Sequence, residues 1–176
     1  MSRPQIQSII EGSIQVKQAL LKDEQLMLEI EKIVHAITHA FKQGNAVYFA
    51  GNGGSAADAQ HLAAEFSGRF YKDRKALPAE ALHCNTSYLT AVGNDYGFEF
   101  VYSRLIEGIG NEGDVLVGIS TSGNSANIVK AFEMAKTNGS VAATKAMFET
   151  SSVTNMPINA IMAISTKMLV ISRLDR

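Results

Sequence analysis

The chain has 176 residues, of which 46% are hydrophobic and 19% charged, a balance that allows one packed domain and excludes wholesale disorder. Sixteen Lys and Arg residues against seventeen Asp and Glu residues give a net charge of −1, which argues against a nucleic-acid or membrane-surface protein. The single cysteine, Cys84, excludes an intrachain disulfide and a cysteine zinc cluster. The chain starts without the apolar segment of a signal peptide, and no apolar run approaches the roughly 20 residues that span a bilayer, so we expect a soluble cytoplasmic protein.

Two helices are predicted over residues 1–43. Apolar residues recur at helical spacing from Ile6 to Leu21, and the pattern resumes after Asp23, a residue type that caps helix N-termini. Gly44 ends the second helix. This N-terminal helical pair either packs against a partner subunit or covers the sheet, and both interpretations stay open.

Short apolar strands alternate with helices over residues 44–139. The predicted strands are residues 46–50, 79–84 and 115–119, and the predicted helices are residues 56–66, 86–92, 98–109 and 124–136. This alternation predicts an α/β fold with a mostly parallel sheet flanked by helices, in which ligands bind beyond the carboxyl ends of the strands. We interpret the whole chain as one domain with an atypical tail over residues 140–176.

The tail differs in composition from the rest of the chain. It contains no glycine, four of the seven methionines and nine Ser or Thr residues, and its only acidic residues are Glu149 and Asp175. Residues 158–174 have the apolar spacing of a helix. No cluster of residues in the tail suggests chemistry.

A glycine loop, Gly51-Asn52-Gly53-Gly54-Ser55, lies between the first predicted strand and the helix after it. Glycines let the backbone turn sharply and approach a ligand, and the N-terminus of the following helix suits an anion. The nucleotide-binding patterns and their lysine are absent. The loop is therefore either a binding loop or a tight strand-to-helix turn.

A serine loop over residues 120–125 occupies the equivalent position after the strand at residues 115–119. Four hydroxyl groups surround Gly123 at a helix start, and they belong to Ser120, Thr121, Ser122 and Ser125. One hydroxyl is enough for a helix cap, whereas four hydroxyls without a lysine or arginine suit a phosphomonoester on a sugar. Two such loops at equivalent strand ends favour a sugar-phosphate pocket.

His61 and Glu65 are four residues apart on the helix after the glycine loop, so both side chains lie on one face and could share a metal ion or a proton path. A surface pair is the alternative. Asn94 and Asp95 are expected in a polar turn that either binds sugar hydroxyls or only turns the chain. A basic run over residues 69–75 is interpreted as solvated surface, with phosphate or partner contact as the second interpretation.

The remaining titratable candidates carry less information. His35 and His39 are interpreted as surface or interface residues on the second helix. His83 and Cys84 end the strand at residues 79–84, where they lie in the core or at a pocket rim, and Cys84 has no evident group to activate it as a nucleophile.

Four motifs in this order resemble the bacterial sedoheptulose 7-phosphate isomerases, or phosphoheptose isomerases. They are GNGGSAADAQH at residues 51–61, AEFSGR at 64–69, GNDYGF at 93–98 and GISTSGNS at 118–125. The resemblance covers residues 1–139 and implies a sugar-isomerase (SIS) fold. It also implies a homotetramer with active sites at subunit interfaces.

The resemblance implies roles for the matching residues. The implied substrate and phosphate ligands are Asn52, Gly53, Gly54, Ser55, Asn94, Asp95, Ser120, Thr121, Ser122 and Ser125. His61 and Glu65 would bind zinc, and Glu65 would also move protons as the catalytic residue. The implied product is D-glycero-D-manno-heptose 7-phosphate, a precursor of bacterial surface heptose, formed through an enediol or enediolate.

The tail departs from the family pattern. The family completes its zinc site with a glutamine and a histidine on a late helix, whereas here no histidine follows His83 and no glutamine follows Gln60. So sharp a change is typical of a shifted reading frame, a misread tail or a degenerate paralogue. The first hypothesis is therefore a phosphoheptose isomerase, and the alternative is a non-catalytic SIS protein that binds a sugar phosphate or a protein partner.

Overall fold

Four parallel strands form the centre of the fold in the computed structural model, which describes residues 2–137 and 141–144. The strands are β1 (Val47–Gly51), β2 (Ala79–Ala81), β3 (Asp114–Ile119) and β4 (Val141–Thr144), and their order in the sheet is β2-β1-β3-β4. The helices are α1 (Arg3–Lys22), α2 (Glu24–Lys42), α3 (Gly54–Ser67), α4 (Thr86–Asp95), α5 (Val101–Ile109) and α6 (Ala126–Thr137), with a short 3-10 helix, η1 (Phe98–Phe100), before α5. The predicted α/β fold with a parallel sheet flanked by helices is confirmed.

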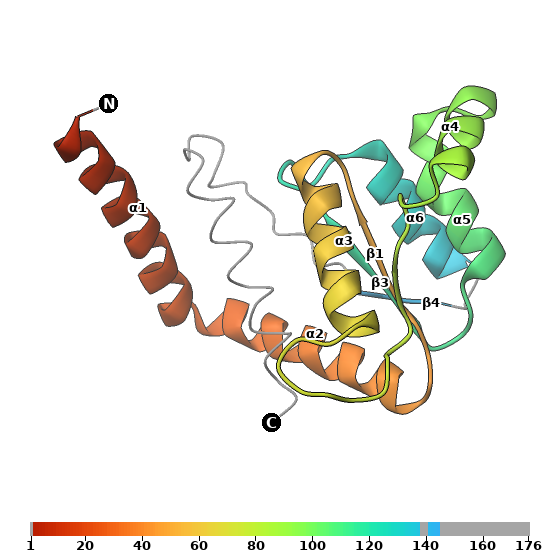
Figure 1. Cartoon of the computed structure of the whole chain (residues 1–176), viewed down its shortest axis with the longest axis horizontal. Coiled ribbons are helices and arrows are strands. Elements are labelled where there is room, and N and C mark those ends of the chain that lie inside the picture. Colours follow the sequence, from red (N-terminus) through yellow and green to blue (C-terminus); the bar gives the residue numbers. More distant parts are fainter. Residues whose placement is uncertain (1, 138–140, 145–176) are drawn as a thin grey trace.

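Every residue of β1 and β3 is buried, because helices cover both faces of the sheet. Val47 and Phe49 of β1 face α2 and α3, where Phe49 stacks on Phe66 with a centroid distance of 6.0 Å. Tyr48 and Ala50 face the other layer, which consists of α4, α5 and α6. Figure 1 shows the sheet between these two helical layers.

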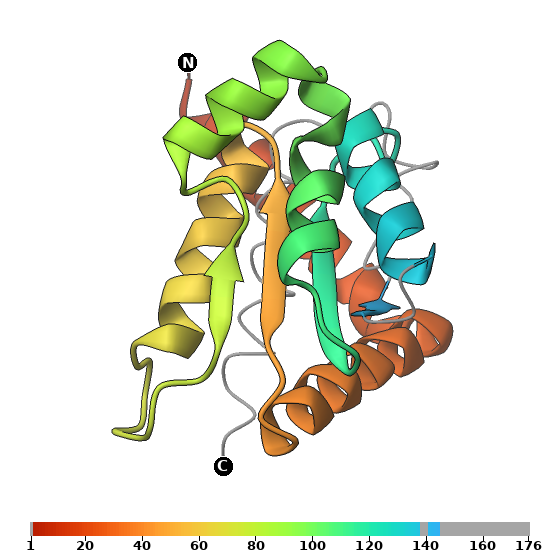
Figure 2. The same cartoon turned by 90° about the vertical axis from the view of Figure 1, so that its right-hand side faces the viewer.

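The connections after β1 and β3 leave the sheet toward opposite faces. The chain passes from β1 through α3 to β2 on one side, and later returns to form β3 on the other side of β1. Such a reversal creates a crevice at the carboxyl ends of the two central strands. In Figure 2 these ends of β1 and β3 point toward the end of the molecule where α4 lies.

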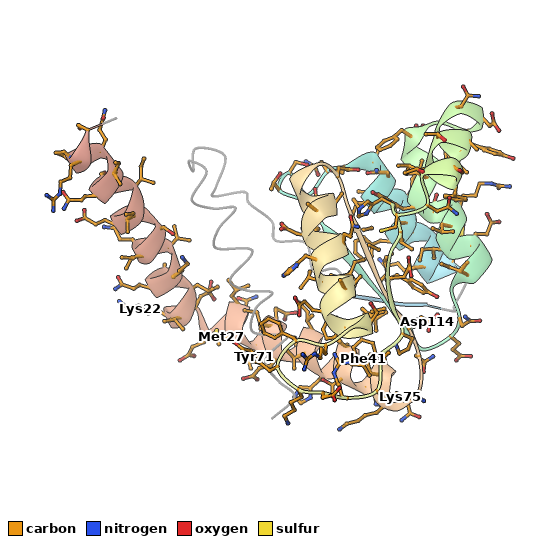
Figure 3. All side chains as sticks on the ribbon, viewed as in Figure 1. Lys22, Met27, Phe41, Tyr71, Lys75 and Asp114 are labelled. Carbon is orange, nitrogen blue, oxygen red and sulfur yellow. The ribbon has the colours of Figure 1, made fainter. Side chains whose placement is uncertain are left out.

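The two N-terminal helices differ in what they contact. Asp23 separates them as predicted, and its side chain accepts a hydrogen bond from the Leu26 amide. Helix α2 buries Ile30, Ile33 and Ile37 against the sheet layer, whereas α1 buries no residue. In Figure 3 the side chains of α1 stand clear of the α/β body. Helix α2 therefore covers the sheet, and within the part of the chain that the structure describes α1 packs only at its α2 end.

Several element boundaries differ from the prediction. Strand β2 ends at Ala81 because Leu82 and His83 already form a turn, and α4 continues through Asn94 and Asp95, which were predicted as a turn. Residues 98–109 divide into η1 and α5, because Phe100 bonds back to Gly97 in a tighter turn. Helix α6 begins at Ala126 rather than at the predicted residue 124. The Ser125 carbonyl accepts the first hydrogen bonds of the helix, from the amides of Ile128 and Val129.

The first described residues of the predicted tail, residues 140–176, belong to the sheet. Val141–Thr144 form β4, which pairs with β3 in parallel register, so the α/β core includes this strand. The helix predicted over residues 158–174 lies outside the described residues. Among the described residues, none of the helices has the length and apolar character needed to cross a membrane.

Candidate sugar-phosphate site

The glycine loop turns the chain from β1 into α3 with little room to spare. The Gly51 Cα approaches Ser55 so closely that an added Cβ would lie 2.4 Å from the Ser55 carbonyl oxygen. Gly53 has a φ of +55°, a value that side-chain-bearing residues rarely adopt. The Ser55 amide donates to the Asn52 carbonyl over 3.0 Å, and α3 begins within the loop. Exposed Gly53 and Gly54 stand at the N-terminus of α3, where the helix dipole favours an anion.

The serine loop draws three of its four hydroxyl groups together. Ser120 Oγ lies 3.1 Å from Ser125 Oγ and 3.4 Å from Ser122 Oγ, and it accepts a hydrogen bond from the Gly123 amide. Ser120 is buried, whereas Thr121 and Ser122 are exposed. A buried hydroxyl thus organises the loop, and exposed hydroxyls remain at its surface. Such a loop can donate several hydrogen bonds to a phosphate without a full positive charge.

A pair of side-chain amides joins the glycine loop to the start of α6, which directly follows the serine loop. Asn52 Nδ2 donates to Asn127 Oδ1 over 2.9 Å, and Asn127 Nδ2 donates back to Asn52 Oδ1 over 2.8 Å. Asn127 is the second residue of α6 and is 3% exposed. The strand order places β1 beside β3, and this pair holds the loop after β1 against the helix that follows the loop after β3. The glycine loop and the serine loop therefore form one site.

A tyrosine from α5 holds the other end of the glycine loop. The buried Tyr102 hydroxyl donates a hydrogen bond to the Gly51 carbonyl. Burial raises the pKa of Tyr102, with the bond to Gly51 acting in the opposite direction, so the phenol keeps the proton that it donates. The sequence interpretation missed both Tyr102 and Asn127. For Asn127 a signal existed, because it shares a helix face with Ala131 and Ala135, where an apolar residue is expected.

His61 and Glu65 lie together on α3 but away from the loops. His61 Nε2 is 3.6 Å from Glu65 Oε1, and the side chains are 68% and 20% exposed, respectively. Glu65 Oε2 is buried and has no hydrogen-bond partner in the described structure. Because Glu65 follows Ser55 by ten residues, the helical rise places it about 15 Å farther along α3. The pair can hold a ligand, and along α3 His61 lies about two turns and Glu65 about three turns from Ser55 of the glycine loop.

The remaining predicted residues have local roles in the structure. Asn94 donates to Asp95 over 2.8 Å, and both residues are exposed at the end of α4, so their contact with a sugar stays a prediction. In the basic run, Arg74 is not solvated surface, because its guanidinium caps the C-terminus of α3. It donates to the carbonyls of Phe66 and Glu65 over 2.9 and 3.1 Å.

His83 and Cys84 lie in the turn after β2. Burial lowers the pKa of His83, whose Nδ1 has no hydrogen-bond partner among the described residues. Burial, and then the charge of Glu80, raise the pKa of Cys84, which favours the thiol over the nucleophilic thiolate. A cysteine nucleophile is therefore not favoured here.

Similarity to known proteins agrees with this geometry. A profile of the SIS domain matches residues 14–144, which include both loops and all four strands. Phosphoheptose isomerase from Aneurinibacillus thermoaerophilus is 54% identical over 137 residues, which cover 78% of this chain and 69% of that protein. The chain belongs to the SIS-domain family, among the phosphoheptose isomerases. The enzyme of this name from Clostridium acetobutylicum is 54% identical over 134 residues, covering 76% of this chain and 68% of that protein.

Solved structures of phosphoheptose isomerases share the fold. The structure from Neisseria gonorrhoeae has a TM-score of 0.79 at 32% identity and covers 97% of each chain. The structure from Francisella tularensis also has a TM-score of 0.79, at 31% identity, and covers 98% of this chain and 94% of that one. The SIS fold expected from the motifs is therefore confirmed.

Proposed function

We propose that this SIS-domain protein is an aldose-ketose isomerase that converts sedoheptulose 7-phosphate to D-glycero-D-manno-heptose 7-phosphate for bacterial surface heptose. The observation that carries the proposal is the Asn52–Asn127 pair, which holds the glycine loop against the start of α6, directly after the serine loop, where the strand order of the sheet reverses. The relatives reported above are named as enzymes of this kind, which favours catalysis over the non-catalytic alternative. A cytoplasmic location stays a prediction.

The serine loop is the proposed phosphate subsite. Ser122 and Thr121 are exposed on it, and the buried Ser120 hydroxyl and the Gly123 backbone keep the loop in one conformation. Donors fixed before binding lose little entropy when the phosphate arrives. The glycine loop supplies backbone amides at the N-terminus of α3, and Asn94 and Asp95 are proposed to contact the sugar hydroxyls.

The reaction moves hydrogen between C1 and C2 of the sugar. A base removes a proton from C1 of the ketose to give an enediolate, and a proton is returned to C2, while the hydroxyl proton passes from O1 to O2. Glu65 is the proposed proton carrier, because Oε2 of its carboxylate is buried and unpaired. A carboxylate in this state can accept a proton from carbon without first breaking a hydrogen bond to another protein group.

Zinc is the proposed cofactor, with His61 and Glu65 as two of its ligands. An imidazole nitrogen and a carboxylate are ordinary zinc donors, and the unpaired Glu65 Oε2 fits such a role. When bound, zinc would stabilise negative charge on the substrate oxygens. Within residues 2–137 and 141–144, no group of three or more His, Cys, Asp or Glu side chains is placed to hold a metal. His61 and Glu65 therefore fit part of a zinc site.

The proposed assembly is a homotetramer, as is usual in the family, and it would bring the separated parts of the site together. Ile6, Ile10 and Ile14 recur every four residues on α1 and are 45%, 54% and 48% exposed. Such an apolar stripe is typical of a helix that packs against another subunit. Assembly would also allow His61 and Glu65 of one copy to meet the loops of another, which the distance along α3 makes difficult within one copy.

Substitution of Ser122 tests the phosphate subsite. In Ser122→Ala the loop keeps the buried Ser120 hydroxyl but loses an exposed donor, so affinity for sedoheptulose 7-phosphate should fall by roughly 1–3 kcal/mol. Titration calorimetry measures this change. Ser67→Ala, which removes an exposed hydroxyl at the far end of α3, is the matched control and should bind normally. Unchanged affinity in Ser122→Ala would remove the serine loop from the phosphate site.

Charge introduced on α1 tests the assembly. Wild-type protein at micromolar concentration should scatter light as a tetramer, and Ile10→Asp with Ile14→Asp should shift it to smaller species because two carboxylates cannot be buried at low cost. As a control, Gln15→Asp places a single carboxylate on a different face of α1 and should leave the assembly intact, and each of Ile10→Asp and Ile14→Asp alone should weaken it. A wild-type monomer under these conditions would refute the oligomer.

A further inference from the structure

We propose that Asn127 is a positioning residue for the sugar-phosphate site, where it locks Asn52 and the glycine loop against the start of α6. Asn127 lies outside the loop motifs, and its side chain is buried behind them. The effect of Asn127 on substrate binding and catalysis rests on the proposed function. The effect of Asn127 on the conformation of the glycine loop can be tested without substrate.

The orientation of the amide pair follows from a third hydrogen bond. Asn127 Oδ1 accepts from the Ile128 amide over 3.0 Å as well as from Asn52 Nδ2, so this oxygen has used both of its lone pairs. A flipped Asn127 amide would turn its NH₂ group toward the Ile128 N–H. The oxygen position is therefore determined, and the Asn52 amide must present its NH₂ group to it. Two reciprocal hydrogen bonds then fix both side chains in one arrangement.

The pair decides what Asn52 can offer to a ligand. Its side chain uses one N–H and one oxygen lone pair on Asn127, which leaves one N–H and one lone pair. The Asn52 carbonyl is also engaged, because it accepts from the Ser55 amide. The glycine loop is thus held through Asn52 on the α6 side and through the Gly51 carbonyl, by Tyr102, on the α5 side. Gly53 and Gly54 lie just after these two anchors and remain exposed.

Burial strengthens the hydrogen-bonded pair of Asn52 and Asn127. Asn127 is 3% exposed, and a buried amide that loses its partner pays the cost of desolvation without compensation. Movement of the glycine loop away from α6 would break both bonds at once. The serine loop precedes α6 directly, so the same contact fixes the spacing between the two loops. Correct spacing matters because one ligand must touch both loops.

The test compares Asn127→Ala and Asn127→Asp with a matched core variant. Asn127→Asp keeps the shape and can still accept from Ile128, but its carboxylate faces Asn52 Oδ1 without a proton to donate. Ile128→Ala is the control, because it removes a buried side chain from the adjacent position and leaves the amide pair in place. Thermal unfolding shows how far each variant is destabilised.

Hydrogen exchange of the substrate-free protein gives the first readout. Amides in the peptide that covers residues 51–55 should exchange about tenfold faster in both Asn127 variants, since the anchor is lost, and at the wild-type rate in Ile128→Ala. Equal exchange in all four proteins would overturn the proposal. So would equal acceleration in Ile128→Ala and Asn127→Ala, because the effect would then follow stability alone.

Calorimetry with sedoheptulose 7-phosphate gives the second readout. Affinity should fall about tenfold in Asn127→Ala, and the double variant Asn52→Ala/Asn127→Ala should be no weaker than Asn52→Ala alone, because Asn127 acts only through Asn52. Additive losses would overturn the shared role. If wild-type protein binds no sugar phosphate, the proposed function fails, and hydrogen exchange still decides whether Asn127 positions the loop.

Discussion

The 176-residue chain is expected to isomerise sedoheptulose 7-phosphate roughly 10²–10⁴-fold more slowly than the same chain with a tail that carries the glutamine and histidine of the family. A catalytic zinc site normally takes three protein ligands and a water molecule, and the described part of this chain offers His61 and Glu65. The sequence has no histidine after His83 and no glutamine after Gln60. A second acid-base group and further metal ligands would both be lacking.

The experiment measures turnover and bound zinc in parallel. The 176-residue chain is compared with a chimera whose residues after Gly139 come from the phosphoheptose isomerase of Aneurinibacillus thermoaerophilus. Both proteins are assayed in the presence and in the absence of added zinc. A second chimera with alanine at the glutamine and histidine positions is the matched control, because it has the same length and lacks only these side chains. The first chimera should gain both zinc affinity and turnover, and the control should gain neither.

Robust turnover by the 176-residue chain would contradict this prediction. It would mean that another residue supplies the missing group, and His83 of a neighbouring subunit would be the first candidate, because its Nδ1 has no hydrogen-bond partner within the part of the chain that the structure describes. Glu65→Gln in the active chimera tests both proposed functions of the carboxylate together. It removes the proton carrier and weakens the metal site, so both rate and zinc content should fall.

The second large effect is expected for Gly51→Ala. A Cβ at this position would lie 2.4 Å from the Ser55 carbonyl oxygen and 2.5 Å from its carbon, and both are backbone atoms that cannot move without opening the turn from β1 to α3. Overpacking of this kind costs about 3 kcal/mol of unfolding free energy. The variant should also lose sugar-phosphate binding, because the glycine loop and the N-terminus of α3 shift together.

Denaturant unfolding checks the stability change, and Gly108→Ala is the matched control. Gly108 lies within α5 with nothing near the position of an added Cβ, so alanine should raise the unfolding free energy by roughly 0.5–1 kcal/mol through its higher helix propensity. A Gly51→Ala protein as stable as wild type would show that the loop is not tightly packed against Ser55.

The sequence alone determined the local elements and the chemistry of the loops. Apolar spacing located both N-terminal helices and their break at Asp23, and the buried strands β1 and β3, because burial leaves a periodic pattern in consecutive residues. Glycines after β1 and hydroxyls after β3 likewise identified two loops with the properties of a phosphate site. These properties depend on neighbours in the chain, so they can be predicted without the fold.

Only the tertiary structure decided which parts meet. The order β2-β1-β3-β4 places the two loops side by side, and no local pattern encodes which strands become neighbours. Asn127 and Tyr102 act on the glycine loop from positions 75 and 51 residues away in the chain, respectively, so their roles arise from packing. Apolar periodicity marked both α1 and α2, yet among the described residues only α2 has buried side chains, because periodicity marks a face that needs a partner without saying where the partner lies.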